Sequence, residues 1–298
     1  MGVAAILAGQ AKDLGGGFTV SRLLPAAGRR SVGPFVFFDH FGPVTELPDA
    51  NHDVRPHPHI GLATVSYLFE GAIMHRDSLG TEQLVEPGAI NWMSAGRGIV
   101  HSERRPPHLR DRRYVNHGLQ LWVALPREHE EDEPFFRHTP AAAIPCVNFG
   151  NAEVRVLVGC AFGAVSPVAT SSATLYLDVT LPAGGTLELP ALAAEMAVYA
   201  VLGDLSVDQQ AIPAGAMAVL APGAPARLAA GPACRFVVIG GDPLDGPRHL
   251  WWNFVSSRKE RILQAAQDWE ADRMGEVPGD DERIPLPPTR FAPPEPMS

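Results

Sequence analysis

Short apolar runs separated by glycine and proline turns are the feature of this sequence that most restricts its fold. Clear cases lie at residues 63–69, 89–93 and 99–103, each bounded by turn signals. The 298-residue chain has 29 glycines and 29 prolines, which is above ordinary usage. Runs this short and this evenly spaced predict antiparallel strands in a small barrel or jelly roll.

The same rhythm returns in the second half of the chain, after a charged segment at residues 126–140. Short β-type runs such as 174–181 and 235–239 again alternate with turns. We therefore predict an all-β fold with two tandem barrels. The predicted domains are residues 1–135 and residues 136–250.

The C-terminal section, residues 251–298, has a different character. Ser257 and Glu260 match a capping box, and apolar side chains follow at helical spacing. The apolar positions are Ile262, Leu263, Ala266 and Trp269. We predict one amphipathic helix that packs on the barrels, followed by a proline-rich tail that runs extended along the surface.

His57 and His59 form a His-x-His pair, which ordinary core packing seldom requires. Side chains i and i+2 of a strand point to the same face, so the two imidazoles would lie side by side. His101 and Glu103 repeat this spacing with an imidazole and a carboxylate. Two such strands predict a site of three histidines and one glutamate inside the first barrel, against the alternative of ordinary polar residues at a barrel mouth.

His75 and Asp77 form a third pair of this kind and are rival ligands. They precede a predicted hairpin turn, where an aspartate commonly hydrogen-bonds its own backbone, so we favour a turn role or a supporting role for them. Gln120 and Trp122 share one strand face, and pocket lining and plain core are both open for them. Met74 is a further candidate for the cavity wall.

Two other observations concern histidines. His40 is expected to make a structural hydrogen bond rather than to act in catalysis. Between His138 and His249 the chain has no histidine. The second barrel therefore has no imidazoles with which to repeat the predicted site.

The composition excludes several classes of function. The formal net charge is −9, and the one arginine cluster, residues 110–113, is short and interrupted by an acid, so direct nucleic-acid binding is not expected. Cys146, Cys160 and Cys234 show no C-x-x-C spacing, which argues against a disulfide framework or thiolate zinc site and fits a reducing cytosol. Since no apolar segment approaches ~20 residues, we expect a cytoplasmic protein without membrane contact.

Five segments of the first half carry a family resemblance. They are FVFFDHFGP at residues 35–43, RPHPHIGLATVSYLFEG at 55–71, HRDSLG at 75–80, NWMSAGRGIVHSE at 91–103 and GLQLWVALP at 118–126. These segments strongly resemble the pirins, a two-domain family of the cupin superfamily. The resemblance spans nearly all of residues 18–126 and continues weakly beyond them.

The general cupin motifs fit this chain with departures in both motifs. Thr64 stands where the first cupin motif has a glutamate, although Gly71 is correctly placed. The second motif leads to His101 with two extra residues. The resemblance implies that Glu103 supplies the fourth ligand from a new position, as in pirins.

The resemblance implies a metal-binding N-terminal cupin domain and a C-terminal cupin domain without metal ligands. The implied cofactor is one divalent transition metal, Fe(II), with copper, nickel, manganese and zinc as alternatives. The implied activity is that of quercetin 2,3-dioxygenase, which cleaves a flavonol with O₂ and releases CO. Glu103 would then be both a metal ligand and the catalytic group that accepts the substrate proton.

Two other functions stay open at this point. The first is a metal- or redox-sensing regulatory protein that binds a protein partner without turnover. The negative net charge suits a protein partner better than DNA. The second is a metal-dependent isomerase or another cupin hydrolase, because cupin sites support many chemistries.

Overall fold

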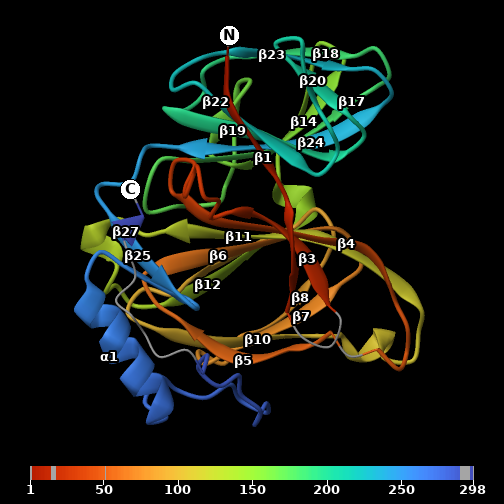
Figure 1. The fold of residues 1–298 in the computed structure, drawn as a ribbon. Helices are drawn as coiled ribbons and strands as arrows, with labels where there is room; N and C mark the ends of the chain where they lie inside the picture. Colours follow the sequence, from red (N-terminus) through yellow and green to blue (C-terminus); the bar gives the residue numbers. More distant parts are fainter. Residues whose placement is uncertain (1, 15–17, 51, 289–295, 298) are drawn as a thin grey trace. The chain divides into compact units, whose positions relative to one another are not determined.

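The computed structural model describes residues 2–14, 18–50, 52–288 and 296–297. β-Strands make up most of the described chain, with one α-helix near the C-terminus (Figure 1). The all-β fold with a C-terminal helix is thereby confirmed. No helix in the described ranges is long and apolar enough to cross a bilayer.

The chain forms two compact units that are discontinuous in sequence. One, which we call the apolar unit, comprises residues 1–11, 21–38 and 142–243. The other, the histidine unit, comprises residues 12–20, 39–141 and 244–298. The predicted consecutive domains, 1–135, 136–250 and 251–298, stay a prediction, and the compact units interleave these segments.

The apolar unit is built from two antiparallel sheets and one small hairpin, β15 (Cys160–Ala161) with β16 (Ala164–Val165). The seven-stranded sheet runs in the order β1 (Val3–Ala8), β22 (Ala216–Leu220), β19 (Glu195–Leu202), β24 (Cys234–Gly241), β17 (Thr174–Leu181), β14 (Ala152–Val158) and β13 (Cys146–Phe149). The four-stranded sheet runs in the order β18 (Thr186–Leu189), β23 (Ala226–Ala230), β20 (Leu205–Val207) and β21 (Gln210–Ile212).

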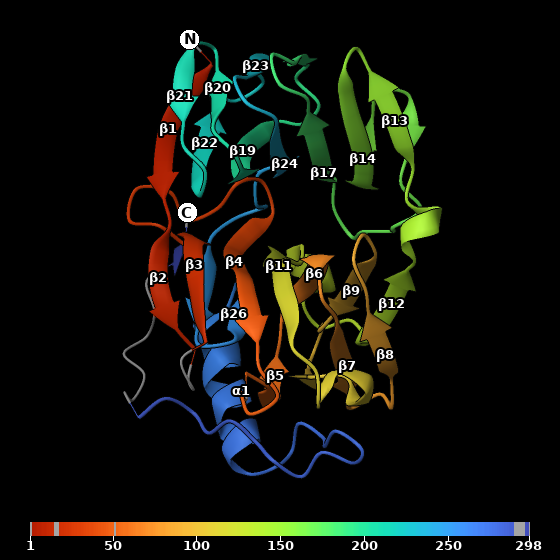
Figure 2. The same cartoon turned by 90° about the vertical axis from the view of Figure 1, so that its right-hand side faces the viewer.

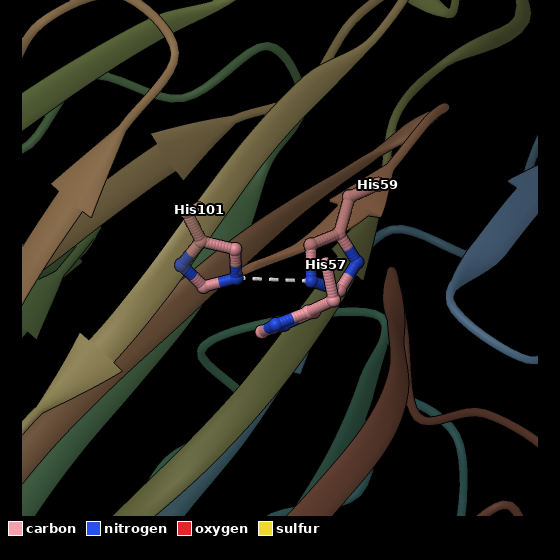
Figure 3. Close-up of side chains that lie close together, drawn as sticks. All are labelled: His57, His59 and His101. Carbon is pink, nitrogen blue, oxygen red and sulfur yellow. Dashed lines mark hydrogen bonds between the residues drawn. The ribbon is translucent and has the colours of Figure 1, made fainter. Parts of the chain in front are cut away.

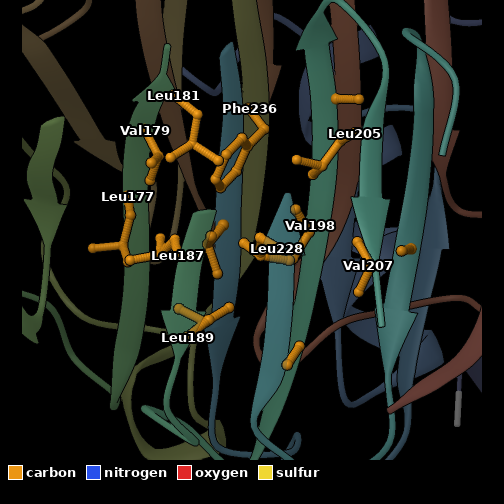
Figure 4. Packing of buried hydrophobic residues seen from close by; sticks show 14 of the residues in the cluster. Leu177, Val179, Leu181, Leu187, Leu189, Val198, Leu205, Val207, Leu228 and Phe236 are labelled. Atoms are coloured by element: carbon orange, nitrogen blue, oxygen red, sulfur yellow. The ribbon is translucent and has the colours of Figure 1, made fainter. Parts of the chain in front are cut away.

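The core of the apolar unit follows from strand alternation. Leu177 and Val179 point to one face of β17, and Leu187 and Leu189 to one face of β18, because alternate residues of a strand share a face. These side chains and Phe236 belong to one buried apolar cluster (Figure 4). Burial of such side chains contributes roughly 1.5–3 kcal/mol each.

The N-terminal strand explains why the apolar unit includes the start of the chain. β1 pairs antiparallel with β22, so that Ile6 lies opposite Ala218. Residues 3–8 therefore extend a sheet whose other strands come from the second half of the sequence.

The histidine unit contains a second pair of sheets. Its seven-stranded sheet runs in the order β12 (Phe135–Thr139), β9 (Ile90–Ser94), β6 (Leu62–Glu70), β11 (Tyr114–Ala124), β4 (Phe35–Glu46), β3 (Thr19–Leu24) and β2 (Gln10–Asp13) (Figure 2). The four-stranded sheet runs in the order β5 (Val54–His59), β10 (Ile99–Arg104), β7 (Ile73–Asp77) and β8 (Glu82–Val85). Strands β2, β3 and β4 each contain residues of both units. Three short 3₁₀ helices lie at Pro107–Leu109, Arg127–His129 and Ala141–Ala143.

The C-terminal section of the histidine unit contains β25 (Arg248–Trp251), β26 (Phe254–Ser256), α1 (Lys259–Glu270) and β27 (Pro296–Met297). Ile262, Ala265 and Trp269 of α1 are buried in one cluster with Ile60 and Val100. The predicted helix is therefore confirmed, and Figure 1 shows it beside β5 and β10.

Two details predicted for this helix are wrong. Leu263 is 43% exposed and lies outside the apolar stripe, whereas Ala265 is buried. The capping box does not form, because the N-cap is Arg258 without a side-chain cap. The Ser257 hydroxyl instead donates to Oε2 of Glu130 at 2.9 Å.

Candidate metal centre

Strands β5 and β10 bring three histidines together inside the histidine unit. The antiparallel register places His101 directly opposite His57, and His59 follows two residues further along β5. All three imidazoles are buried, and one ring nitrogen from each lies within 4.8 Å of those of the other two (Figure 3). The three histidines form a group that could bind a metal ion.

The prolines of β5 make this strand the end of its sheet. β5 occupies a terminal place in the four-stranded order, as expected of residues that donate no ladder hydrogen bond. Pro56 and Pro58 alternate with the histidines and therefore point to the opposite face. The carbonyl of Pro56 accepts a hydrogen bond of 2.8 Å from the backbone N–H of Ile284.

Backbone carbonyls fix the protonation pattern of two of the imidazoles. Nδ1 of His57 lies 2.8 Å from the carbonyl of Arg55, and Nδ1 of His59 lies 3.1 Å from that of Asn253. A carbonyl only accepts, so each Nδ1 carries the proton and each Nε2 keeps its lone pair. Such contacts are the usual partners of metal-binding histidines.

His101 is arranged differently. Its Nε2 lies 3.1 Å from Nε2 of His59, and the dashed line of Figure 3 marks this contact. Since Nε2 of His59 is an acceptor, we assign the shared proton to His101. Its Nδ1 is buried and has no hydrogen-bond partner among the described residues.

Burial keeps these histidines neutral at pH 7. It lowers the pKa of His57 to about 4, although the hydrogen bond to Arg55 opposes the shift and nearby His75 adds to it. Burial likewise lowers the pKa of His59 and His101 well below the ordinary value, with neighbouring histidines as a further cause. A neutral imidazole is the form that binds a metal.

Glu103 follows His101 on β10 and pairs with His75 of β7. It lies outside the three-histidine group, and its Oε1 accepts a hydrogen bond of 3.3 Å from the hydroxyl of Ser66 on β6. Burial raises the pKa of the Glu103 carboxyl, while His75 and the Ser66 hydrogen bond oppose that shift. Its role as fourth ligand stays a prediction.

The rival pair, His75 and Asp77, is engaged with itself and with the hairpin turn. Nε2 of His75 lies 3.1 Å from Oδ2 of Asp77, and the His75 ring stacks on Phe136 at a centroid distance of 4.4 Å. Oδ1 of Asp77 accepts backbone N–H groups from Leu79 and Thr81 at 2.9 and 3.0 Å. The predicted turn role of Asp77 is confirmed.

Strand β11 supplies two further neighbours of the histidines. Trp122 is buried, and its ring meets His59 edge-on at 5.2 Å. Gln120 pairs with Ser66 across the β11–β6 ladder, and its Oε1 lies 2.8 Å from the Ser66 hydroxyl. Both residues therefore point toward the site.

Met74 and His40 lie away from the three histidines. Met74 alternates with His75 on β7 and so points to the other face, which makes the prediction of a cavity-lining Met74 wrong. His40 makes the expected structural hydrogen bond, since its Nε2 lies 2.7 Å from Nε2 of His117.

Two participants were not identified from the sequence. The Asn253 carbonyl that contacts His59 belongs to a turn 194 positions away, and no local pattern indicates it. Ser66 could have been found, because it lies two residues after Thr64 and so shares the strand face that the cupin motif turns toward its metal.

The comparisons with known families are consistent with this architecture. The family model described as Pirin matches residues 17–123, and the one described as Pirin C-terminal cupin domain matches residues 176–275. A pirin-like protein of Caulobacter vibrioides is 46% identical over 93% of this chain and 96% of its own length.

Two further relatives carry an enzyme name. A protein of Pseudomonas aeruginosa, provisionally named a quercetin 2,3-dioxygenase, is 36% identical over 88% of this chain and 82% of its own length. A crystal structure of quercetin 2,3-dioxygenase from Acinetobacter baumannii matches with a TM-score of 0.92 at 32% identity, covering 99% of this chain and 98% of that one. The family and structure matches confirm the predicted tandem cupin fold.

Proposed function

Because the chain belongs to the pirin family, we propose that it is a metal-dependent dioxygenase that cleaves flavonol-type substrates with O₂. The observation that carries the proposal is the buried group of His57, His59 and His101. The likeness to the Acinetobacter baumannii quercetin 2,3-dioxygenase over 99% of the chain supports this substrate class.

The donor set fits a divalent transition metal. Two Nε2 atoms offer lone pairs because their Nδ1 protons are held by carbonyls, and the proton between His59 and His101 is one that a cation can replace. His57, His59, His101 and Glu103 would hold the ion. Three imidazoles and one carboxylate, without a thiolate, suit Fe(II), and copper, nickel, manganese and zinc compete for such ligands. When bound, the ion supplies open coordination positions for O₂ and a chelating substrate.

The protein's own residues would orient the substrate and move its proton. Trp122 provides an apolar wall next to His59, and Ser66 and Gln120 provide polar groups. Glu103 accepts the proton of the substrate hydroxyl, because it is the carboxylate that follows His101 on β10 and a carboxylate can act as a general base. One lone pair of its Oε1 is taken by Ser66, and the second is available for that proton.

A reconstitution experiment tests the proposal. Metal-free protein is loaded anaerobically with Fe(II), its metal content is measured, and O₂ uptake and CO release are followed with quercetin. We expect turnover by the wild-type protein and loss of turnover in His59→Ala and Glu103→Ala. His129→Gln is the matched control, because His129 is a half-exposed histidine paired with Asp132 outside the site.

The outcomes separate the candidate functions. Bound iron without turnover above that of the metal-free protein would contradict the enzyme and favour the regulatory alternative, a metal-sensing protein with a protein partner. Full metal content in both alanine variants would contradict the ligand assignment.

A further inference from the structure

We propose that Ser66, oriented by Gln120, is the positioning residue that holds the Glu103 carboxylate for metal binding. The inference rests on the proposed function, because it assumes a metal at the three histidines. It adds two residues of the seven-stranded sheet to a site whose ligands all come from the four-stranded sheet.

Glu103 needs such a support because strand pairing fixes its backbone, opposite His75 of β7, but does not fix the position of its carboxylate. The ladder between β10 and β5 is irregular between His101 and Glu103, so that His101 pairs with His57 whereas Glu103 pairs with Val54. The extra residue belongs to β5, so His101 and Glu103 keep their i and i+2 relation on β10 but lose a regular neighbour on the β5 side. Among the described residues, Ser66 is the one hydrogen-bond partner of the Glu103 carboxylate.

Ser66 is placed by its strand and by Gln120. The β6–β11 register sets Ser66 directly opposite Gln120, and side chains at such paired positions touch. The Ser66 hydroxyl is buried and lies 2.8 Å from the amide of Gln120 and 3.3 Å from Oε1 of Glu103. A continuous series of hydrogen bonds therefore runs from Gln120 on β11 through Ser66 on β6 to Glu103 on β10.

The number of available protons determines which group donates in each of these hydrogen bonds. A serine hydroxyl has one proton, and it cannot serve both Oε1 of Gln120 and an ionised Glu103. Half a turn of the Gln120 amide exchanges its oxygen and nitrogen with little change of shape. Nε2 of Gln120 then donates to Ser66, and Ser66 donates to Oε1 of Glu103.

This direction has a consequence for the ion. With Oε1 held by Ser66, the carboxylate cannot rotate freely, and Oε2 remains for the metal. Hydrogen-bonded support of this kind typically contributes roughly 10–100-fold to metal affinity.

Co(II) is a suitable probe, because its visible spectrum reports the coordination geometry. Titration of the metal-free protein should show about tenfold weaker binding by Ser66→Ala, with a shifted spectrum, and wild-type affinity for Ser66→Thr, which keeps the hydroxyl. Gln120→Met should weaken binding less, with no added effect in the Ser66→Ala protein. In the Glu103→Ala protein, Ser66→Ala should have no effect, because coupled residues are not additive.

Two results would overturn the inference while leaving the metal site intact. One is wild-type Co(II) affinity in Ser66→Ala when Glu103→Ala binds weakly. The other is an equal loss from Ser66→Ala with and without Glu103, which a general structural defect would cause. Failure of the wild-type protein to bind Co(II) or Fe(II) would instead overturn the proposed function together with the inference.

Discussion

His57 and His101 face each other across neighbouring antiparallel strands, and their ring centroids are 4.3 Å apart. Directly opposite side chains in such a ladder are held close by the backbone. The distance between these two imidazoles is therefore set by strand pairing and does not depend on a loop. His59 completes the group from the same strand, and its Nε2 contacts His101.

Removal of one imidazole should abolish tight metal binding. Loss of a residue that only supports a ligand lowers metal affinity by roughly 10–100-fold. We expect His59→Ala to lower the affinity for Co(II) or Fe(II) by a larger factor. Elemental analysis after dialysis measures the metal per chain. His129→Gln should retain the wild-type content, and equal retention by His59→Ala would remove His59 from the ligand set.

The stability of the metal-free protein should fall as the pH drops from about 6.5 to about 4. Burial, with a contribution from His117, lowers the pKa of His40 from 6.5 to about 4. Within that window the unfolded chain binds a proton that the folded chain excludes, so folding is penalised as the pH falls. Above pH 6.5 both states are neutral and the penalty is absent.

Denaturant unfolding at several pH values measures this effect. His40 alone accounts for at most about 3 kcal/mol at pH 4, and the buried metal-site histidines act in the same direction. The variant His40→Gln should show a shallower dependence of the unfolding free energy on pH than the wild type, whereas His129→Gln should match it. Identical slopes for His40→Gln and wild type would refute the assignment.

Removal of one charge from a buried ion pair in the histidine unit should strongly lower the unfolding free energy. Nε of Arg248 lies 2.8 Å from Oε1 of Glu130, and both side chains are buried. Glu130→Gln removes the buried counter-charge of Arg248 and leaves only the partly exposed Asp245, so we expect a loss of up to about 3–5 kcal/mol of unfolding free energy.

The neighbouring glutamate offers a control for that variant. Glu131 pairs with Arg258 and Arg261 near the surface, so Glu131→Gln should cost at most about 1 kcal/mol. Equal effects of Glu130→Gln and Glu131→Gln in denaturant titrations would contradict the distinction.

The hairpin between β20 and β21 offers a stabilising substitution. Its two-residue loop, Asp208 and Gln209, is left-handed at both positions, with φ of 49° and 68°. Glycine adopts this conformation without a steric penalty, and Asp208 is retained because it accepts backbone N–H groups of Gly2 and Arg227.

We therefore expect Gln209→Gly to raise the unfolding free energy by about 0.5–1 kcal/mol. Ala211→Gly, in the adjoining strand β21, should lower it by a similar amount, about 0.5–1 kcal/mol. Thermal melting of the two variants gives the comparison. A lower melting temperature for Gln209→Gly than for wild type would contradict the left-handed loop.

Local sequence patterns were sufficient for the three histidines and for most strands, but not for β1, or for β12 (Phe135–Thr139), which lies in the segment predicted to be a charged linker. The i and i+2 spacing of His57 and His59 determines that they share a face, and the segment around His101 forms the strand predicted at residues 99–103, observed as Ile99–Arg104. The pattern could not indicate that His101 would lie opposite His57, because register depends on the pairing of distant strands.

Contacts between residues far apart in sequence account for the errors in the predicted domains and in the predicted helix cap. β1 joins a sheet more than 200 residues away in sequence, so the compact units do not follow consecutive segments. Ser257 has the local sequence of a helix cap, but Glu130 takes its hydroxyl. Tertiary contacts of this kind override local preference.

The prolines of β5 have a consequence for the behaviour of the protein at high concentration. β5 ends its sheet, and the Pro56 carbonyl faces the outer edge, where Ile284 already occupies it. Pro56 and Pro58 offer no N–H to that edge. A strand from another molecule therefore finds no N–H donor at these two positions, which disfavours edge-to-edge pairing along the strand that carries two of the three histidines.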